Sequence, residues 1–364
     1  MLEKGKISTL QMQFIIIPTI IATGILSIPS MAAQLAVHDM WMTPIAGSII
    51  GFITVFLVWK LHELFPRMTP IQYNEKILGK ILGSMLSFFL IFFYLHNTGL
   101  IVRQYTDFIT MNVLTETPEL IFSLSIMVVS ALAVRGGIEV IARSAVICTT
   151  IFMLSSLSLL LLIKDMDVSL LLPIMENGIT PVLKGGFVFG AWYSELFLLA
   201  FIFPFLNREK ISVKPGILAT IYIMLIFFYV NFFVLTVLGV TAGNQLYPVY
   251  SLIRAISVFD FFENFEVIIT ASWVLGNFVK ISMFLYVVSL ALAQLLRLSD
   301  YRIVVYPISL FIILFSQWGL PNYVVLVDYM KNIQPTYFLL VQVILPLCLL
   351  LIALARGMRG RKTN

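Results

Sequence analysis

The chain has 364 residues, of which 60% are hydrophobic and 11% are charged, and its net charge is +5. Soluble domains carry about a quarter charged residues, so this composition excludes a water-soluble protein. Because a membrane span takes about 20 apolar residues, the length leaves room for about ten spans and for no large soluble domain.

Stretches of uninterrupted apolarity predict an all-α integral membrane protein with about ten transmembrane helices. The fourth stretch is short for a span, and it would need the neighbouring Pro118–Glu119 turn and a locally thinner bilayer. In chain order the stretches are Leu10–Leu35, Met42–Leu64, Ile81–Val102, Leu120–Val134, Val140–Ile163, Phe187–Phe205, Ile217–Val240, Val267–Leu292, Val304–Trp318 and Tyr337–Ala355.

Basic residues in the short loops predict the orientation of the chain. Of the 23 Lys and Arg residues, two lie within or at the edge of spans, and one side of the membrane holds only Lys164, Lys184, Arg254 and Lys331. The other 17 fall on the side that carries both termini. We therefore expect both termini in the cytoplasm, and we expect the basic tail Arg356–Lys362 to contact anionic lipid.

Five spans in each half place the first span of each half on opposite sides of the membrane, which is the topology of an inverted repeat. We therefore predict one transmembrane domain over residues 1–364, with a first repeat at about 8–163 and a second at about 185–356.

The first span of each repeat carries residues that weaken a helix near mid-depth. Gly24 and Pro29 do so in the first span, and Gly190 precedes Ala191–Glu195 in the sixth. We expect broken first and sixth helices, interrupted at Thr23–Ile28 and at Ala191–Glu195. The alternative is an ordinary kink in each helix.

Polar residues in the third and second spans have more than one reading. His96 and Asn97 either face a pocket or make a buried hydrogen bond between helices. Arg103 and Asp107, four residues apart, are explained by a local ion pair or by snorkelling. The Gly47-xxx-Gly51 spacing predicts close helix packing.

Two ionisable residues, Glu195 and Lys280, lie near the middle of the sixth and eighth stretches. A charge at that depth costs roughly 2.5–3.5 kcal/mol and usually marks a functional site. In a functional reading, Glu195 balances a ligand ammonium or takes up a proton. In a structural reading, it forms an ion pair with Lys280 that fixes the bundle.

The long loop Thr241–Glu266 contains apolar residues at helical spacing, namely Val249, Leu252, Ile253 and Ile256. This pattern predicts a short amphipathic helix, which would act as a lid or plug over the bundle or lie as a simple interfacial helix.

Motifs for catalysis and for metal binding are not found. The two cysteines, Cys148 and Cys348, lie in apolar stretches, and the three histidines have no cysteine near them. There is also no phosphate loop, catalytic triad or nucleic-acid signature, so we expect no enzyme activity, no cofactor, no metal and no nucleic acid.

Several segments, in this order, give the whole chain a resemblance to the spore-germination permease family, the B subunits of bacterial germinant receptors. They are Thr23–Pro29, Arg103 and Asp107 before Glu116–Pro118, Arg135–Glu139, Leu172–Gly178, Ser194–Leu196, Tyr247-Pro248, Asn264–Glu266, Trp318 and Asp328-Tyr329. The family belongs to the amino acid–polyamine–organocation superfamily, so the resemblance implies a fold like that of the leucine transporter.

The resemblance also implies a function, a location and partners. The chain would be the germinant-sensing subunit of a receptor in the inner spore membrane. It would bind a small germinant, which we expect to be an amino acid, and act with an A subunit and a lipoprotein C subunit. The alternative is an autonomous proton-coupled amino acid transporter.

The expected ligand site lies between the two predicted breaks. An unwound helix exposes backbone groups and partial charges that suit the carboxylate and ammonium of an amino acid. Lys280 could also replace the cation that related sodium-coupled carriers hold between the first and eighth spans. The ligand-binding residues that we expect are Thr23, Gly24, Ile25, Leu26, Ser27, Asn97, Ala191, Trp192, Tyr193, Ser194 and Glu195.

Overall fold

The computed structural model describes residues 2–207, 211–256, 265–320 and 322–358. Within these ranges the regular structure is helical, apart from one isolated bridge between Ile7 and Leu206. Asn264 of the long loop, and the part of the basic tail from residue 359 on, lie outside the described residues.

Ten helical segments of the described chain cross the bundle, as predicted. Eight segments are long and apolar enough to span a membrane; one of them, Thr9–Leu64, contains two helices, and the shorter apolar helix Arg302–Gln317 adds the last crossing. The crossings are α1 (Thr9–Ala36), α2 (Thr43–Leu64), α4 (Lys80–Asn112), α5 (Glu119–Gly136), α6 (Ile138–Ser156), α7 (Thr180–Ser194) with its continuation, α9 (Lys214–Leu238), α11 (Phe265–Leu295), α12 (Arg302–Gln317), and α14 (Gln334–Leu339) continued by η7 (Leu340–Ile344) and α15 (Leu345–Ala355).

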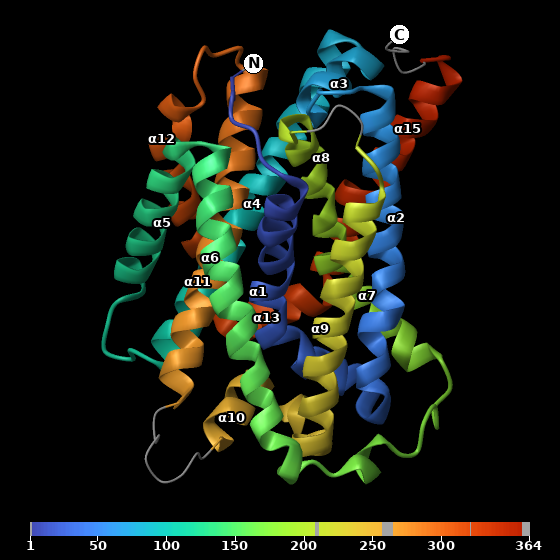
Figure 1. Cartoon of the computed structure of the whole chain (residues 1–364), viewed down its shortest axis with the longest axis vertical. Helices are drawn as coiled ribbons and strands as arrows, with labels where there is room; N and C mark the ends of the chain where they lie inside the picture. The colour runs from blue at the N-terminus through green and yellow to red at the C-terminus, as the bar shows by residue number, and fades with distance from the viewer. Residues whose placement is uncertain (1, 208–210, 257–264, 321, 359–364) are drawn as a thin grey trace.

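Shorter helices join or cap these crossings. They are η1 (Val37–Met42), α3 (Pro70–Leu78), η2 (Leu157–Asp165), η3 (Val168–Leu171), η6 (Gly239–Asn244), α10 (Pro248–Ala255) and α13 (Tyr323–Asn332). In Figure 1 the start of α1 and the end of α15 lie at the same end of the bundle, and α10 lies at the opposite end. The even number of crossings accounts for this arrangement.

The first span is not broken, which corrects the prediction made for Thr23–Ile28. The α-helix continues for 28 residues through Pro18, Gly24 and Pro29. Side chains of neighbouring helices donate to its backbone carbonyls: Thr149 Oγ1 donates to Phe14 O at 2.7 Å, and Trp273 Nε1 donates to Ala22 O at 2.6 Å. Because Phe14 lies four residues before Pro18, Thr149 replaces the backbone donor that proline lacks. The helix therefore tolerates Pro18 without opening at that position.

Glycines bring α2 and α7 into close contact. A Cβ added at Gly47 would lie 2.5 Å from Phe189 Cβ and 2.9 Å from the Gly186 carbonyl oxygen. A Cβ added at Gly51 would lie 2.9 Å from Thr220 Cγ2 on α9. Only glycine allows this approach, so the packing role predicted for the Gly47-xxx-Gly51 spacing is confirmed.

The predicted amphipathic helix is α10. Its apolar residues Val249, Leu252 and Ile253 are buried, as is Ile256 directly after it. The helix contacts α1, α9 and α11. It therefore covers the end of the bundle opposite the termini, and we refer to it below as the lid.

Candidate ligand site in the membrane interior

The two mid-membrane charges meet in the interior of the bundle. Lys280 Nζ, on α11, lies 2.8 Å from Glu195 Oε2 and donates to Thr23 Oγ1 at 2.9 Å. The side chains of Lys280 and Glu195 are 0% and 2% exposed. The bundle thus contains the ion pair of the structural reading, and it joins the sixth and eighth spans where no water can replace either partner.

Thr23 brings the first span into the same cluster. Its Oγ1 accepts a second hydrogen bond from Trp192 Nε1 at 3.1 Å. One hydroxyl of α1 is therefore held by donors from both α7 and α11. These hydrogen bonds tie the first and sixth spans, which carry most of the predicted ligand residues, to Lys280 of the eighth span.

The sixth span changes its helix type where the sequence predicted a break. The α-helix α7 ends at Ser194, and the next turn is the 3₁₀-helix η4 (Glu195–Leu198), followed by α8 (Leu199–Ile202) and η5 (Phe203–Phe205). The Glu195 N–H donates to the Trp192 carbonyl three residues back, whereas an α-helix would use Ala191. The break predicted at Ala191–Glu195 is therefore wrong: the helix tightens into a 3₁₀ turn and does not open into a loop.

Polar side chains of α4 and of the last span also contact the sixth span where α7 ends and η4 begins. Asn97 of α4 is buried and lies beside the Glu195 carboxyl. Gln342 of the last span donates from Nε2 to Ser194 Oγ at 3.2 Å, and its Oε1 accepts from the Tyr94 hydroxyl at 3.2 Å. Our reading of the sequence missed Gln342 and Tyr94, although a glutamine within the apolar stretch Tyr337–Ala355 was the signal that could have found Gln342.

Some of the expected ligand residues pack against other helices. Gly24 faces α9, where an added Cβ would lie 2.8 Å from Phe227 Cζ. The ring of Tyr193 also meets Phe227 edge-on, with ring centroids 6.0 Å apart. These two residues support the site through helix packing and lie outside the hydrogen-bonded cluster around Lys280.

Ile25 and Leu26 line a separate small cavity beneath α10. The cavity has a volume of about 40 Å³, and its walls include Phe152, Trp273 and Tyr250. Ser27, one turn beyond Thr23 on α1, is buried close to Tyr323 of α13. The residues predicted on α1 therefore extend from the ion pair toward the lid.

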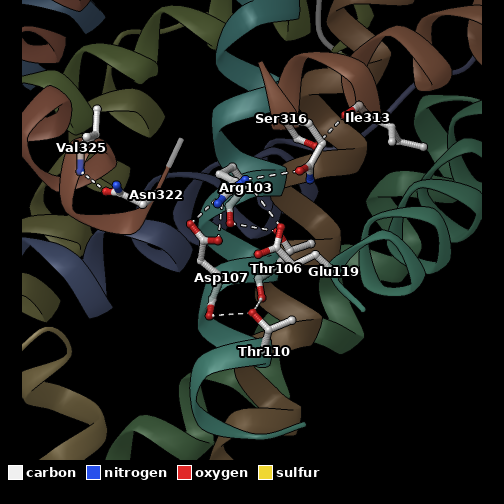
Figure 2. Close-up of polar contacts among 10 residues, drawn as sticks. Arg103, Thr106, Asp107, Thr110, Glu119, Ile313, Ser316, Asn322 and Val325 are labelled. Atoms are coloured by element: carbon white, nitrogen blue, oxygen red, sulfur yellow. Dashed lines mark hydrogen bonds and ion pairs between the residues drawn. The ribbon is translucent and has the colours of Figure 1, made fainter. Parts of the chain in front are cut away.

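Another ion cluster surrounds Arg103 of α4 (Figure 2). Arg103 Nε lies 2.9 Å from Asp107 Oδ1, so the predicted local pair is confirmed. Arg103 Nη1 also lies 3.6 Å from Glu119 Oε2 on α5 and donates to Gln317 Oε1 on α12 at 3.4 Å. Arg103 therefore connects three helices.

Comparison with known families and sequences gives one consistent result. A family model described as "Spore germination protein" (Spore_permease) matches residues 6–324. Spore germination protein KB of Bacillus subtilis (strain 168) is 29% identical over 372 aligned positions, which cover 100% of this chain and 98% of that protein. Spore germination protein YndE of the same organism is 24% identical, and the match covers 80% of this chain and 82% of that protein.

Solved structures with a similar fold are membrane transporters. A Na⁺-coupled sialic acid symporter superposes with a TM-score of 0.68 at 14% identity, covering 93% of this chain and 79% of that chain. A nucleobase-cation-symport-1 family transporter superposes with a TM-score of 0.60 at 14% identity, covering 90% and 78%. At such identity the likeness shows a transporter-like fold and carries no substrate with it.

Proposed function

Because the chain belongs to the spore germination permease family, we propose that it is the germinant-sensing membrane subunit of a spore germinant receptor. In this proposal it lies in the inner spore membrane, with both termini in the cytoplasm and its basic end against anionic lipid. It works there with an A subunit and a lipoprotein C subunit. The similarity to spore germination proteins over nearly their full length supports a shared role.

The ligand that fits the site best is a free amino acid. Such a molecule carries one ammonium and one carboxylate, and the site presents Glu195 to the first and Lys280 to the second. The observation that carries this proposal is the buried 2.8 Å contact between the two side chains. A zwitterion can replace that contact with two of its own, so that each buried charge stays paired.

A ligand that replaces the contact between Glu195 and Lys280 would also change the conformation of the bundle. Glu195 and Lys280 hold the sixth and eighth spans together, so a ligand inserted between them changes the distance between two helices. Binding then favours a bundle conformation that the unliganded pair disfavours. A receptor subunit needs such a movement and has no need to carry the ligand across the membrane.

The second candidate is an autonomous proton-coupled amino acid transporter. It is favoured by the fold, which is similar to that of cation-coupled symporters, and by the buried carboxyl of Glu195. Uptake of a labelled amino acid into proteoliposomes that contain only this protein would support transport. A germination response without such uptake would support sensing.

A single substitution beside Thr23 tests the site. Spores that lack the protein, complemented with the wild type, should respond to at least one member of an amino acid panel. Gly24→Leu should abolish that response while the protein still inserts, because even a Cβ at this position would press on Phe227 and Ile28. Immunoblots of the membrane fraction report insertion.

The matched control is Gly276→Ala on α11, where the added Cβ would lie at an ordinary 3.4 Å from Phe152. This variant should respond like the wild type. A Gly24→Leu protein that responds with unchanged concentration dependence would show that the ligand site is elsewhere.

A further inference from the structure

The last span contains one turn of π-helix, η7 (Leu340–Ile344), between α14 and α15. Such a turn adds one residue to the helical repeat and often marks a functional position. Here it separates two kinds of side chain. Leu340 and Ile344 are exposed on the apolar surface, whereas Gln342 between them is fully buried. The one amide side chain within the π-turn is therefore directed into the bundle.

Both ends of the Gln342 amide have partners from other spans. Nε2 donates to Ser194 Oγ on α7, and Oε1 accepts from Tyr94 on α4, each at 3.2 Å. The tyrosine ring also packs edge-on against Phe284, and Lys280 Nζ lies 5.5 Å from the centre of the Phe284 ring. Gln342 is thus linked to the ion pair by two routes: through Ser194, which precedes Glu195, and through Tyr94 and Phe284, which lead to Lys280.

The direction of the hydrogen bonds follows from the tightened turn of the sixth span. Because the Glu195 N–H donates to Trp192, the Ala191 carbonyl has no α-helical donor. The Ser194 hydroxyl donates to that carbonyl at 2.7 Å. A hydroxyl has one hydrogen, so Ser194 can only accept from Gln342, and the amide must turn its NH₂ toward it. Its oxygen is then left for Tyr94.

We propose that Gln342 is a positioning residue for the ligand site. It holds the Ser194 hydroxyl in the orientation that supports the tightened turn, and the next residue along that turn is Glu195. The last span would thereby set where the Glu195 carboxylate lies relative to Lys280. The consequence for ligand response rests on the function proposed above; the coupling to Glu195 does not.

A stability measurement tests the coupling without any ligand. Gln342→Met removes the amide but keeps an unbranched side chain of similar size. We compare the thermal unfolding midpoints of the purified protein in detergent for Gln342→Met, Glu195→Gln and the double variant. If Gln342 positions Glu195, the loss caused by Glu195→Gln is smaller in the Gln342→Met background than in the wild type.

Gln334→Met provides the matched control, because Gln334 is a buried glutamine of the same span outside this network. Its effect should add to that of Glu195→Gln. Additive losses for Gln342→Met as well would overturn the proposal. Since Gln342→Met leaves Tyr94 as an unpaired donor, Tyr94→Phe is added where the single variant is too unstable to purify, and the cycle is repeated in that background.

The functional readout is the germinant concentration that gives a half-maximal response. We expect Gln342→Met to raise it about tenfold at equal protein abundance, in keeping with one lost buried hydrogen bond. An unchanged half-maximal concentration, with a wild type that responds normally, would contradict positioning. A wild type that responds to no amino acid would instead count against the proposed function and leave the stability result valid.

Discussion

Two buried ion pairs hold this bundle together in different ways. Glu195 and Lys280 come from separate spans, and their side chains are 2% and 0% exposed. Arg103 and Asp107 come from the same helix, four residues apart, and Arg103 is 10% exposed. A pair within one helix cannot fix the distance between two helices. Arg103 does so only through its longer contacts to Glu119 and Gln317.

A pair within one helix and a pair between two helices have different structural consequences in a membrane protein. The Arg103 cluster connects three helices near the lid, and it extends from the buried Asp107 to Glu119, which is 37% exposed. The Glu195–Lys280 pair controls the spacing of two helices at a depth where water is excluded. In the function that we propose, only the second arrangement turns the exchange of a charged partner into a movement of helices, which is why we place the ligand there.

The largest expected effect comes from removing one partner of the central pair. Glu195→Gln and Lys280→Met should each reduce stability by roughly 3–5 kcal/mol, because each leaves a buried charge without a counter-charge. Protein abundance in the membrane should fall sharply for each single variant. The double variant should recover abundance and remain insensitive to ligand.

Quantitative immunoblots of the membrane fraction measure this effect, and the buried Ser309→Ala of α12 serves as a control outside both pairs. Losses that simply add in the double variant would show that the two residues act separately. Glu195 would then be a ligand or proton site by itself.

A smaller effect is expected from Arg103→Met. The Asp107 carboxylate is fully buried and would lose its charged donor, which costs roughly 1.5–3 kcal/mol. The thermal unfolding midpoint in detergent should fall, and a second change, Asp107→Asn, should restore part of the loss. A midpoint equal to that of the wild type would mean that water reaches Asp107 without hindrance.

The smallest effect is expected from Glu119→Gln. Its carboxylate is 37% exposed and lies 3.6 Å from the Arg103 guanidinium, so the pair should contribute about 0–1 kcal/mol and weaken as salt increases. Unfolding midpoints at low and high salt measure it. A loss as large as that of Arg103→Met would show that α5 depends on this contact, and the contrast between the two pairs would be weaker than we describe.

The sequence predicted the ten crossings because apolar stretches long enough to span a bilayer have few other uses. It also predicted that Glu195 and Lys280 could pair, since each is costly alone at that depth. Two features depended on packing that a sequence does not show. Gly24 looks like a helix opener, yet its missing side chain serves the approach of Phe227. Gln342 reaches Ser194 from within a π-turn, a local helix geometry that the apolar pattern of the last span does not reveal.

The predicted ends of the spans were also limited by packing that the sequence does not show. The third span was predicted to end at Val102, but α4 continues to Asn112. Its final turns carry polar residues such as Gln104 and Thr106, which lie beyond the predicted apolar stretch and are buried by neighbouring helices in the structure. Packing against neighbouring spans thus accompanies the continuation of α4 through this polar segment. The repeat boundaries and the ligand-binding roles remain predictions.

We propose that Lys280 supplies a fixed positive charge to the ligand site in place of a bound cation, so that no sodium ion is required. The most direct test compares the amino acid response in sodium-free and sodium-rich media at matched ionic strength, with choline as the replacing cation. We predict the same half-maximal ligand concentration in both media. A strict requirement for sodium would contradict the claim and show that the Lys280 ammonium does not take the place of an ion.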